Sequence, residues 1–185
     1  MKKQPLAFID VETTGFDPNR HEIIDIGGVI AKRHQTDDDQ FGLTVVDEFE
    51  FKVKPTDITA ADPQALAVNG YNEAEWMFAP DLSQVMPEVA AKTAGAVLVA
   101  HNLWFDLAFL EAAFAKTKVT NKMHHGKLDT ISMAFIKLCF NPAIDRFSLA
   151  ALAEYFDIDN PKAHTALADA KTTMAVFEKL LLTDS

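Results

Sequence analysis

The chain has 185 residues, of which 49% are hydrophobic and 24% are charged, and it carries a formal net charge of −10. This composition is ordinary for one globular domain with a substantial core, and it argues against a disordered chain. The acidity also argues, taken alone, against a nucleic-acid partner, because phosphate binding usually draws on a basic surface.

Three strand-like segments open the chain. Apolar and β-branched residues predict strands at Leu6–Glu12, Glu22–Arg33 and Leu43–Lys54. Turn residues between Gly15 and Asn19 separate the first two, and the polar stretch 34–40 separates the second from the third. Short turns of this kind favour an antiparallel meander.

After Pro55 the pattern changes to helices that alternate with strands. We expect two further strands, at 96–100 and 123–128, and helices at 62–68, 81–93, 103–116, 130–140, 148–156 and 165–182. A meander followed by alternating helices and strands predicts an α/β fold, a mixed five-stranded sheet with helices on both faces. The single cysteine, Cys139, excludes a disulfide framework; we expect it to pack in a helix of a cytoplasmic protein.

The first predicted strand contains the stretch FIDVETTG, with carboxylates at Asp10 and Glu12. Side chains alternate along a strand, so these two residues share one face with Leu6 and Phe8. Two negative charges held this close raise one another's pKa and cost stability unless a cation or a proton lies between them. The stretch therefore raises the question of a cation site.

Two later segments carry further polar residues among apolar ones. In AHNLWFDLAFL, Asp106 lies near the start of an apolar helix, where a carboxylate also stabilises the helix dipole. In KAHTALADA, His164 ends a loop and Asp169 lies about one and a half turns into the last helix. Taken singly, His164 could be a helix-boundary residue and Asp169 an exposed helical carboxylate.

The four carboxylates together indicate a site. Asp10, Glu12, Asp106 and Asp169 each lie at the end of a strand or near the start of a helix, and such positions converge at one edge of a sheet. Oxygen ligands suit hard cations such as Mg²⁺ or Mn²⁺. A nearby imidazole, His164, then has a natural role as general base.

In this order, DVETTG, HNLWFD and HTALAD resemble the three motifs of the DEDDh 3′→5′ exonucleases. The group includes the proofreading subunit of bacterial DNA polymerase III and ribonuclease T, and the resemblance extends from about Leu6 to Val176. It implies a ribonuclease H-like fold, with one exonuclease domain over residues 1–185. It also implies hydrolysis of the terminal phosphodiester with two divalent cations, Mg²⁺ or Mn²⁺.

The same resemblance implies a role for each motif residue. Asp10 would bridge both cations, Glu12 and Asp169 would complete the ligands of one, and Asp106 would support the other, partly through water. His164 would deprotonate the attacking water from a loop before the last helix. Two cations clamp the attacking and leaving oxygens and neutralise the charge that develops between them.

Substrate contacts are also implied. In the family, residues after the second carboxylate hold the terminal nucleotide, and others flank its base. In this chain the matching residues are Thr13, Thr14, Gly15, Ala65, Val68, Asn69 and Phe105. Asn69 stands where the proofreading relatives often have histidine; asparagine can donate a hydrogen bond to a sugar or phosphate but carries no charge. We expect the neighbouring Trp104 to pack in the core.

The predicted substrate is the 3′ end of single-stranded DNA. The acidity is then no obstacle, because two divalent cations neutralise four of the carboxylates. An exoribonuclease of the ribonuclease T or oligoribonuclease type is the first alternative, and a non-catalytic module that binds DNA ends beside a polymerase is the second. The expected partner protein is a DNA polymerase or a repair protein. No segment of the sequence reads as a membrane span, and the sequence does not indicate an oligomeric state.

Overall fold

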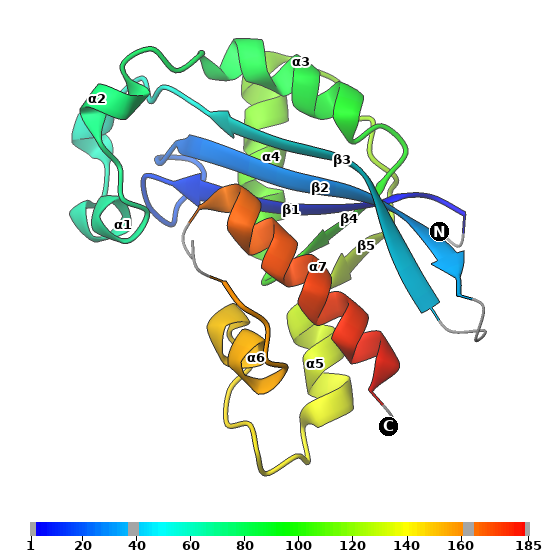
Figure 1. Ribbon diagram of the computed structural model, residues 1–185. Coiled ribbons are helices and arrows are strands. Elements are labelled where there is room, and N and C mark those ends of the chain that lie inside the picture. The colour runs from blue at the N-terminus through cyan, green and yellow to red at the C-terminus, as the bar shows by residue number, and fades with distance from the viewer. Residues whose placement is uncertain (1–2, 37–40, 161–164, 184–185) are drawn as a thin grey trace.

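A computed structural model describes residues 3–36, 41–160 and 165–183 and shows a twisted five-stranded sheet (Figure 1). The strand order is β3-β2-β1-β4-β5. The first two pairings along the chain, β1 with β2 and β2 with β3, are antiparallel, whereas β4 pairs parallel with both β1 and β5. The strands are β1 (Leu6–Thr13), β2 (Ile23–Gln35), β3 (Phe41–Lys52), β4 (Val97–Ala100) and β5 (Lys127–Asp129).

Helices cover both faces of the sheet. Several begin where the sequence supplies a cap: the Asp62 carboxylate accepts from the Gln64 N–H, and the Asp129 carboxylate accepts from the Ser132 N–H. The helical elements are η1 (Ile58–Ala60), α1 (Pro63–Val68), α2 (Glu73–Trp76), α3 (Leu82–Lys92), α4 (Leu103–Thr117), α5 (Thr130–Leu138), α6 (Leu149–Tyr155) and α7 (Ala166–Leu182).

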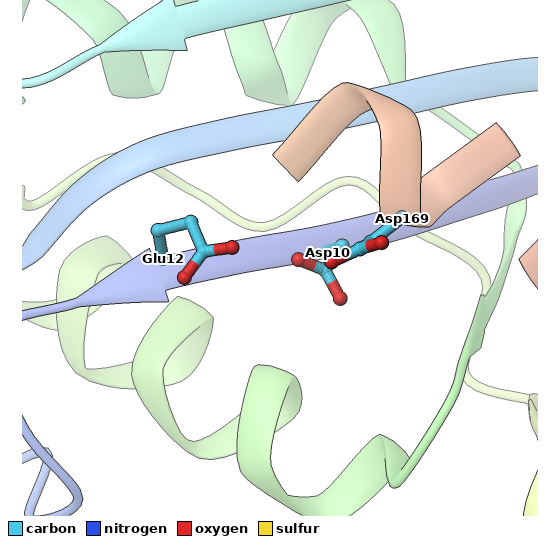
Figure 2. A group of neighbouring side chains, drawn as sticks. All are labelled: Asp10, Glu12 and Asp169. Atoms are coloured by element: carbon cyan, nitrogen blue, oxygen red, sulfur yellow. The ribbon is translucent and has the colours of Figure 1, made fainter. Parts of the chain in front are cut away.

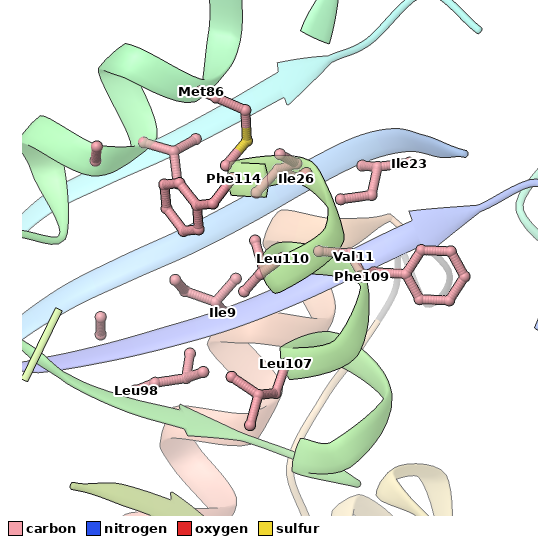
Figure 3. Packing of buried hydrophobic residues seen from close by; sticks show 14 of the residues in the cluster. Ile9, Val11, Ile23, Ile26, Met86, Leu98, Leu107, Phe109, Leu110 and Phe114 are labelled. Carbon is pink, nitrogen blue, oxygen red and sulfur yellow. The ribbon is translucent and has the colours of Figure 1, made fainter. Parts of the chain in front are cut away.

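The core lies on both faces of the sheet, as the alternation along β1 predicts. Ile9 and Val11 pack with residues of α3 and α4 on one face (Figure 3). Leu6 and Phe8 pack under α7 on the other face, where the Phe8 and Phe177 rings meet edge to face with centroids 5.3 Å apart. Helices α5 and α6 pack against α7. The predicted mixed sheet with helices on both faces is confirmed.

Three expectations were wrong, and one short helix was missed. The segment predicted as a strand at 123–128 is a strand only from Lys127, and the four-residue α2 was missed because it is too short to show a periodicity. Trp104 is 74% exposed, since it lies about 200° around α4 from Asp106, which faces the sheet. Cys139 is exposed and forms the C-cap of α5, directly after its last residue, Leu138. None of the described helices combines the length and apolar character that a membrane span requires.

Candidate active site

Three carboxylates meet where β1 passes under the first turn of α7. Asp10 and Glu12 project from the same face of β1, and Asp169 reaches them from α7 (Figure 2). One oxygen from each carboxylate lies within 4.8 Å of the other two. A distance of this size allows all three groups to hold one cation.

Helix α7 comes this close because β2 has a glycine under its first residues. Gly27 pairs with Asp10 across the sheet. A Cβ atom at Gly27 would lie 2.1 Å from the backbone of Ala166 and Leu167 at the start of α7. Only a residue without a side chain permits this contact. Gly27 therefore brings Asp169 down to the strand that carries Asp10.

Asp106 belongs to the site but lies apart from the three. It occupies the first turn of α4, is 2% exposed, and its Oδ1 accepts a hydrogen bond of 3.1 Å from the backbone N–H of Val11. The chain turns into α4 at Asn102, whose φ of 65° is in the left-handed region that asparagine tolerates better than most residues. This turn places the carboxylate of Asp106 against β1 at Val11. Val11 is the residue between Asp10 and Glu12 in the sequence.

The electrostatics of the site are those of crowded negative charges. Burial, followed by the charge of Asp106, raises the pKa of Asp10 well above its usual value, and burial raises the pKa of Asp106 as well. A further carboxylate, Asp25, was not predicted from the sequence; it pairs with Glu12 across β1 and β2. Burial and the charge of Glu50 raise the pKa of Asp25 to about 7. A cation would relieve this repulsion.

The ligand chemistry fits a hard divalent cation. The three grouped side chains offer only carboxylate oxygens, and among the described residues no histidine or cysteine joins them. Mg²⁺ and Mn²⁺ prefer such ligands, whereas Zn²⁺ sites usually contain imidazole or thiolate. His164, the predicted general base, lies outside the described residues.

The three residues after Glu12 are buried. The Thr13 hydroxyl donates to the carbonyl of Gly15 at 2.7 Å, and the Thr14 hydroxyl accepts from the Glu22 N–H at 2.8 Å. A Cβ atom at Gly15, where φ is +156°, would lie 2.6 Å from the ring of His21. The glycine thus admits a neighbouring side chain, and the two hydroxyls are bound within the protein.

Asn69 ends α1 and contacts the exit of β1. Its Nδ2 donates to the carbonyl of Thr13 at 2.9 Å, and its Oδ1 accepts from the backbone N–H of Tyr71 at 3.2 Å. At the other end of α1, the N–H of Asp62 donates to the carbonyl of Thr14 at 2.7 Å. Both ends of α1 are therefore fixed to the turn that follows the carboxylates.

Apolar side chains lie near this turn. Val68 is 59% exposed, Ala65 and Phe105 are half-buried, and Phe105 contacts the ring of Phe16 edge to face at 6.3 Å. The sequence interpretation did not include Phe16, which is 74% exposed directly after the buried turn. Its only signal in the sequence was an aromatic residue near the start of a predicted polar turn. Bases stack on aromatic side chains of this kind.

A mixed sheet with this strand order and with carboxylates on its central strand is the ribonuclease H-like α/β architecture. The model of the ribonuclease T-type exonuclease family matches residues 7–177, and the chain belongs to this family. The resemblance to DEDDh 3′→5′ exonucleases, and the expectation that the chain is an enzyme of this class, are thereby confirmed.

Curated relatives include much longer proteins. DNA polymerase III PolC-type of Caldanaerobacter subterraneus subsp. tengcongensis is 32% identical over 93% of this chain, and 3′-5′ exonuclease DinG of Staphylococcus epidermidis is 31% identical over 94%. The chain spans 11% and 18% of these two proteins. Ribonuclease T of Shewanella denitrificans is 28% identical over 91% of this chain and 76% of that protein.

Solved structures of exonuclease I share the fold. One has a TM-score of 0.80 at 17% identity and covers 98% of this chain and 42% of its own. The Escherichia coli exonuclease I complex with a dT13 oligonucleotide has a TM-score of 0.76 at 16% identity, over 98% of this chain and 42% of its own. At these identities the likeness concerns the fold.

Proposed function

We propose that this chain is a metal-dependent 3′→5′ exonuclease that removes nucleoside 5′-monophosphates from the 3′ ends of single-stranded DNA. The observation that carries the proposal is the meeting of Asp10, Glu12 and Asp169 within 4.8 Å, beside the buried Asp106. All four are the carboxylates of the family motifs.

Each residue has a distinct task in this proposal. Two divalent cations, Mg²⁺ or Mn²⁺, would supply an activated water and charge neutralisation at the scissile phosphate. Asp10, Glu12 and Asp169 would hold cations between β1 and α7, and Asp106 would support them from α4. His164 would accept the proton of the attacking water. The backbone of the Thr13–Gly15 turn, together with Ala65, Val68, Asn69 and Phe105, would hold the terminal nucleotide.

Two features support single-stranded DNA as the substrate. A strand end can be gripped by cations and by the exposed rings near Phe105, so a long basic groove is unnecessary despite the net charge of −10. Exonuclease I structures of the same fold were solved with DNA oligonucleotides. The DNA polymerase III PolC-type relative supports a role beside a DNA polymerase. A repair partner and a cytoplasmic location, both expected from the sequence, belong to the same proposal.

RNA is the second candidate substrate. Among the relatives above, ribonuclease T is the one whose own length this chain mostly spans, at 76%. A DNA-end-binding module without catalysis is a weaker candidate, because every carboxylate position of the motifs is filled.

The test is digestion of matched 5′-labelled single-stranded DNA and RNA oligomers with Mg²⁺ or Mn²⁺. A ladder that shortens from the 3′ end of DNA, and that disappears with EDTA or in Asp10→Ala, supports the proposal. Faster digestion of RNA would move the chain to the ribonuclease branch. Strand binding without digestion in either metal would favour the binding module.

A second variant tests the division of roles. His164→Ala should lose most turnover, because the attacking water lacks its base, yet it should bind Mn²⁺ nearly as well as the wild type. A loss of Mn²⁺ affinity as large as that of Asp10→Ala would contradict the assignment of His164 as a base and not a ligand.

A further inference from the structure

Asn160 makes a direct contact with one of the grouped carboxylates. Its Nδ2 donates a hydrogen bond of 2.9 Å to Oδ1 of Asp169. Asn160 follows α6 and is half-buried, whereas Asp169 lies in the first turn of α7. No family motif assigned a task to this asparagine, although it ends the DIDN sequence just before the segment that carries His164.

The chemistry of this contact suits a carboxylate that must also bind a cation. An amide Nδ2 can only donate, so it satisfies one lone pair of Oδ1 and fixes the direction of the carboxylate. It is also neutral, so it leaves the negative charge of Asp169 in place, whereas a lysine or arginine at this position would compete with the cation. Hydrogen bonds of this kind orient the ligands of metal sites and tune the affinity.

The same arrangement occurs at Asp106, where the N–H of Val11 donates to Oδ1. There the donor is a backbone N–H of β1, so the direction of the hydrogen bond is set by the sheet. At Asp169 the donor is a side chain from a separate loop, so the orientation of Asp169 depends on where that loop lies.

We infer that Asn160 is a positioning residue that orients Asp169 for cation binding. The inference rests on the proposed function in so far as the carboxylates hold divalent cations. Asn160 belongs to the segment after α6, so this contact joins that segment to the carboxylate site.

The test measures Mn²⁺ binding to the full chain by electron paramagnetic resonance, with the wild type, Asn160→Ala and a matched control, Asn141→Ala. Asn141, in the segment between α5 and α6, also donates from Nδ2 to a side chain, the hydroxyl of Tyr155 at 2.8 Å. We expect Asn160→Ala to weaken Mn²⁺ binding by about tenfold or more. Asn141→Ala should stay within about twofold of the wild type, even where both variants lose similar thermal stability.

A second readout separates positioning from folding. Excess Mn²⁺ should restore much of the exonuclease activity of Asn160→Ala, because mass action compensates for a weaker site. If the wild type binds Mn²⁺ and digests DNA, two results would overturn the inference. One is an unchanged Mn²⁺ affinity in Asn160→Ala, and the other is an equal loss of Mn²⁺ affinity in Asn141→Ala. A wild type that neither binds Mn²⁺ nor digests would instead overturn the proposed function.

Discussion

Gly27 of β2 pairs with Asp10 of β1, and the backbone at the start of α7 occupies the place where a side chain of Gly27 would stand. The short distance between Asp169 and Asp10 therefore depends on a glycine, which has no side chain and takes no part in the reaction. Because β2 has no side chain at Gly27, the start of α7 can lie close to β1.

Gly27→Ala should damage the site more than the fold. The added methyl has no space and must lift the start of α7, at a cost of about 1 to 3 kcal/mol in the free energy of unfolding. A displacement of about 1 Å at the reacting groups can reduce turnover on the order of a hundredfold. Gly28→Ala is the control, since its methyl would meet the ring of Phe49 and not α7. Thermal unfolding and exonuclease rates of both variants check this, and full activity in Gly27→Ala would contradict it.

Asn69→Asp should weaken substrate binding. Aspartate keeps the acceptor for the Tyr71 N–H but places an oxygen against the Thr13 carbonyl, so α1 loses its attachment to the turn. We expect KM for single-stranded DNA to rise about tenfold with a smaller change in kcat. Asn72→Ala, which removes the cap of α2, is the matched control. Steady-state kinetics decide the point; a KM equal to that of the wild type would show that the contact is dispensable.

Asn69 also bears on sugar selectivity. Because both polar ends of its side chain are bound within the protein, we expect the ratio of DNA to RNA digestion to change little in Asn69→Ala. A large change in that ratio would mean that Asn69 leaves these partners and contacts the sugar.

Asp25→Asn should stabilise the metal-free protein at high pH. With its pKa raised to about 7, folded Asp25 holds a proton that the unfolded chain releases near pH 4. The free energy of unfolding therefore falls as the pH rises between about 4 and 7, by as much as about 4 kcal/mol. In EDTA, Asp25→Asn should melt higher than the wild type at about pH 8 and similarly at about pH 4. If plots of Tm against pH are parallel for the two proteins, the raised pKa of Asp25 is refuted.

Glu22→Gln should show the opposite dependence on pH. Burial acts to raise the pKa of Glu22, but hydrogen bonds from Thr56, Asp57 and Lys116 outweigh it and lower the pKa to about 2. The stabilisation is complete above about pH 4.5 and is lost as the pH falls towards 2. We expect Glu22→Gln to cost about 1 to 2 kcal/mol at neutral pH, allowing for solvent screening. Denaturant titrations at about pH 7 and pH 2.5 measure it, and the difference should shrink to roughly a quarter at the lower pH.

The sequence by itself determined the order of elements, the two faces of β1 and the set of four carboxylates. These features depend on local rules: alternation along a strand, turn residues, caps, and the spacing of short motifs. They placed Asp10 and Glu12 on one face and Asp169 near the start of the last helix, and the structure agrees.

Only the tertiary structure decided the distances between elements that are remote in sequence. The contact of Gly27 with α7, the pairing of Asp25 with Glu12 and the hydrogen bond of Asn160 to Asp169 all join separate segments. The exposure of Trp104 was also decided there, because the direction of a side chain at a helix start depends on which face of the helix meets the sheet. Packing between elements sets such relationships, and local patterns carry little information about packing.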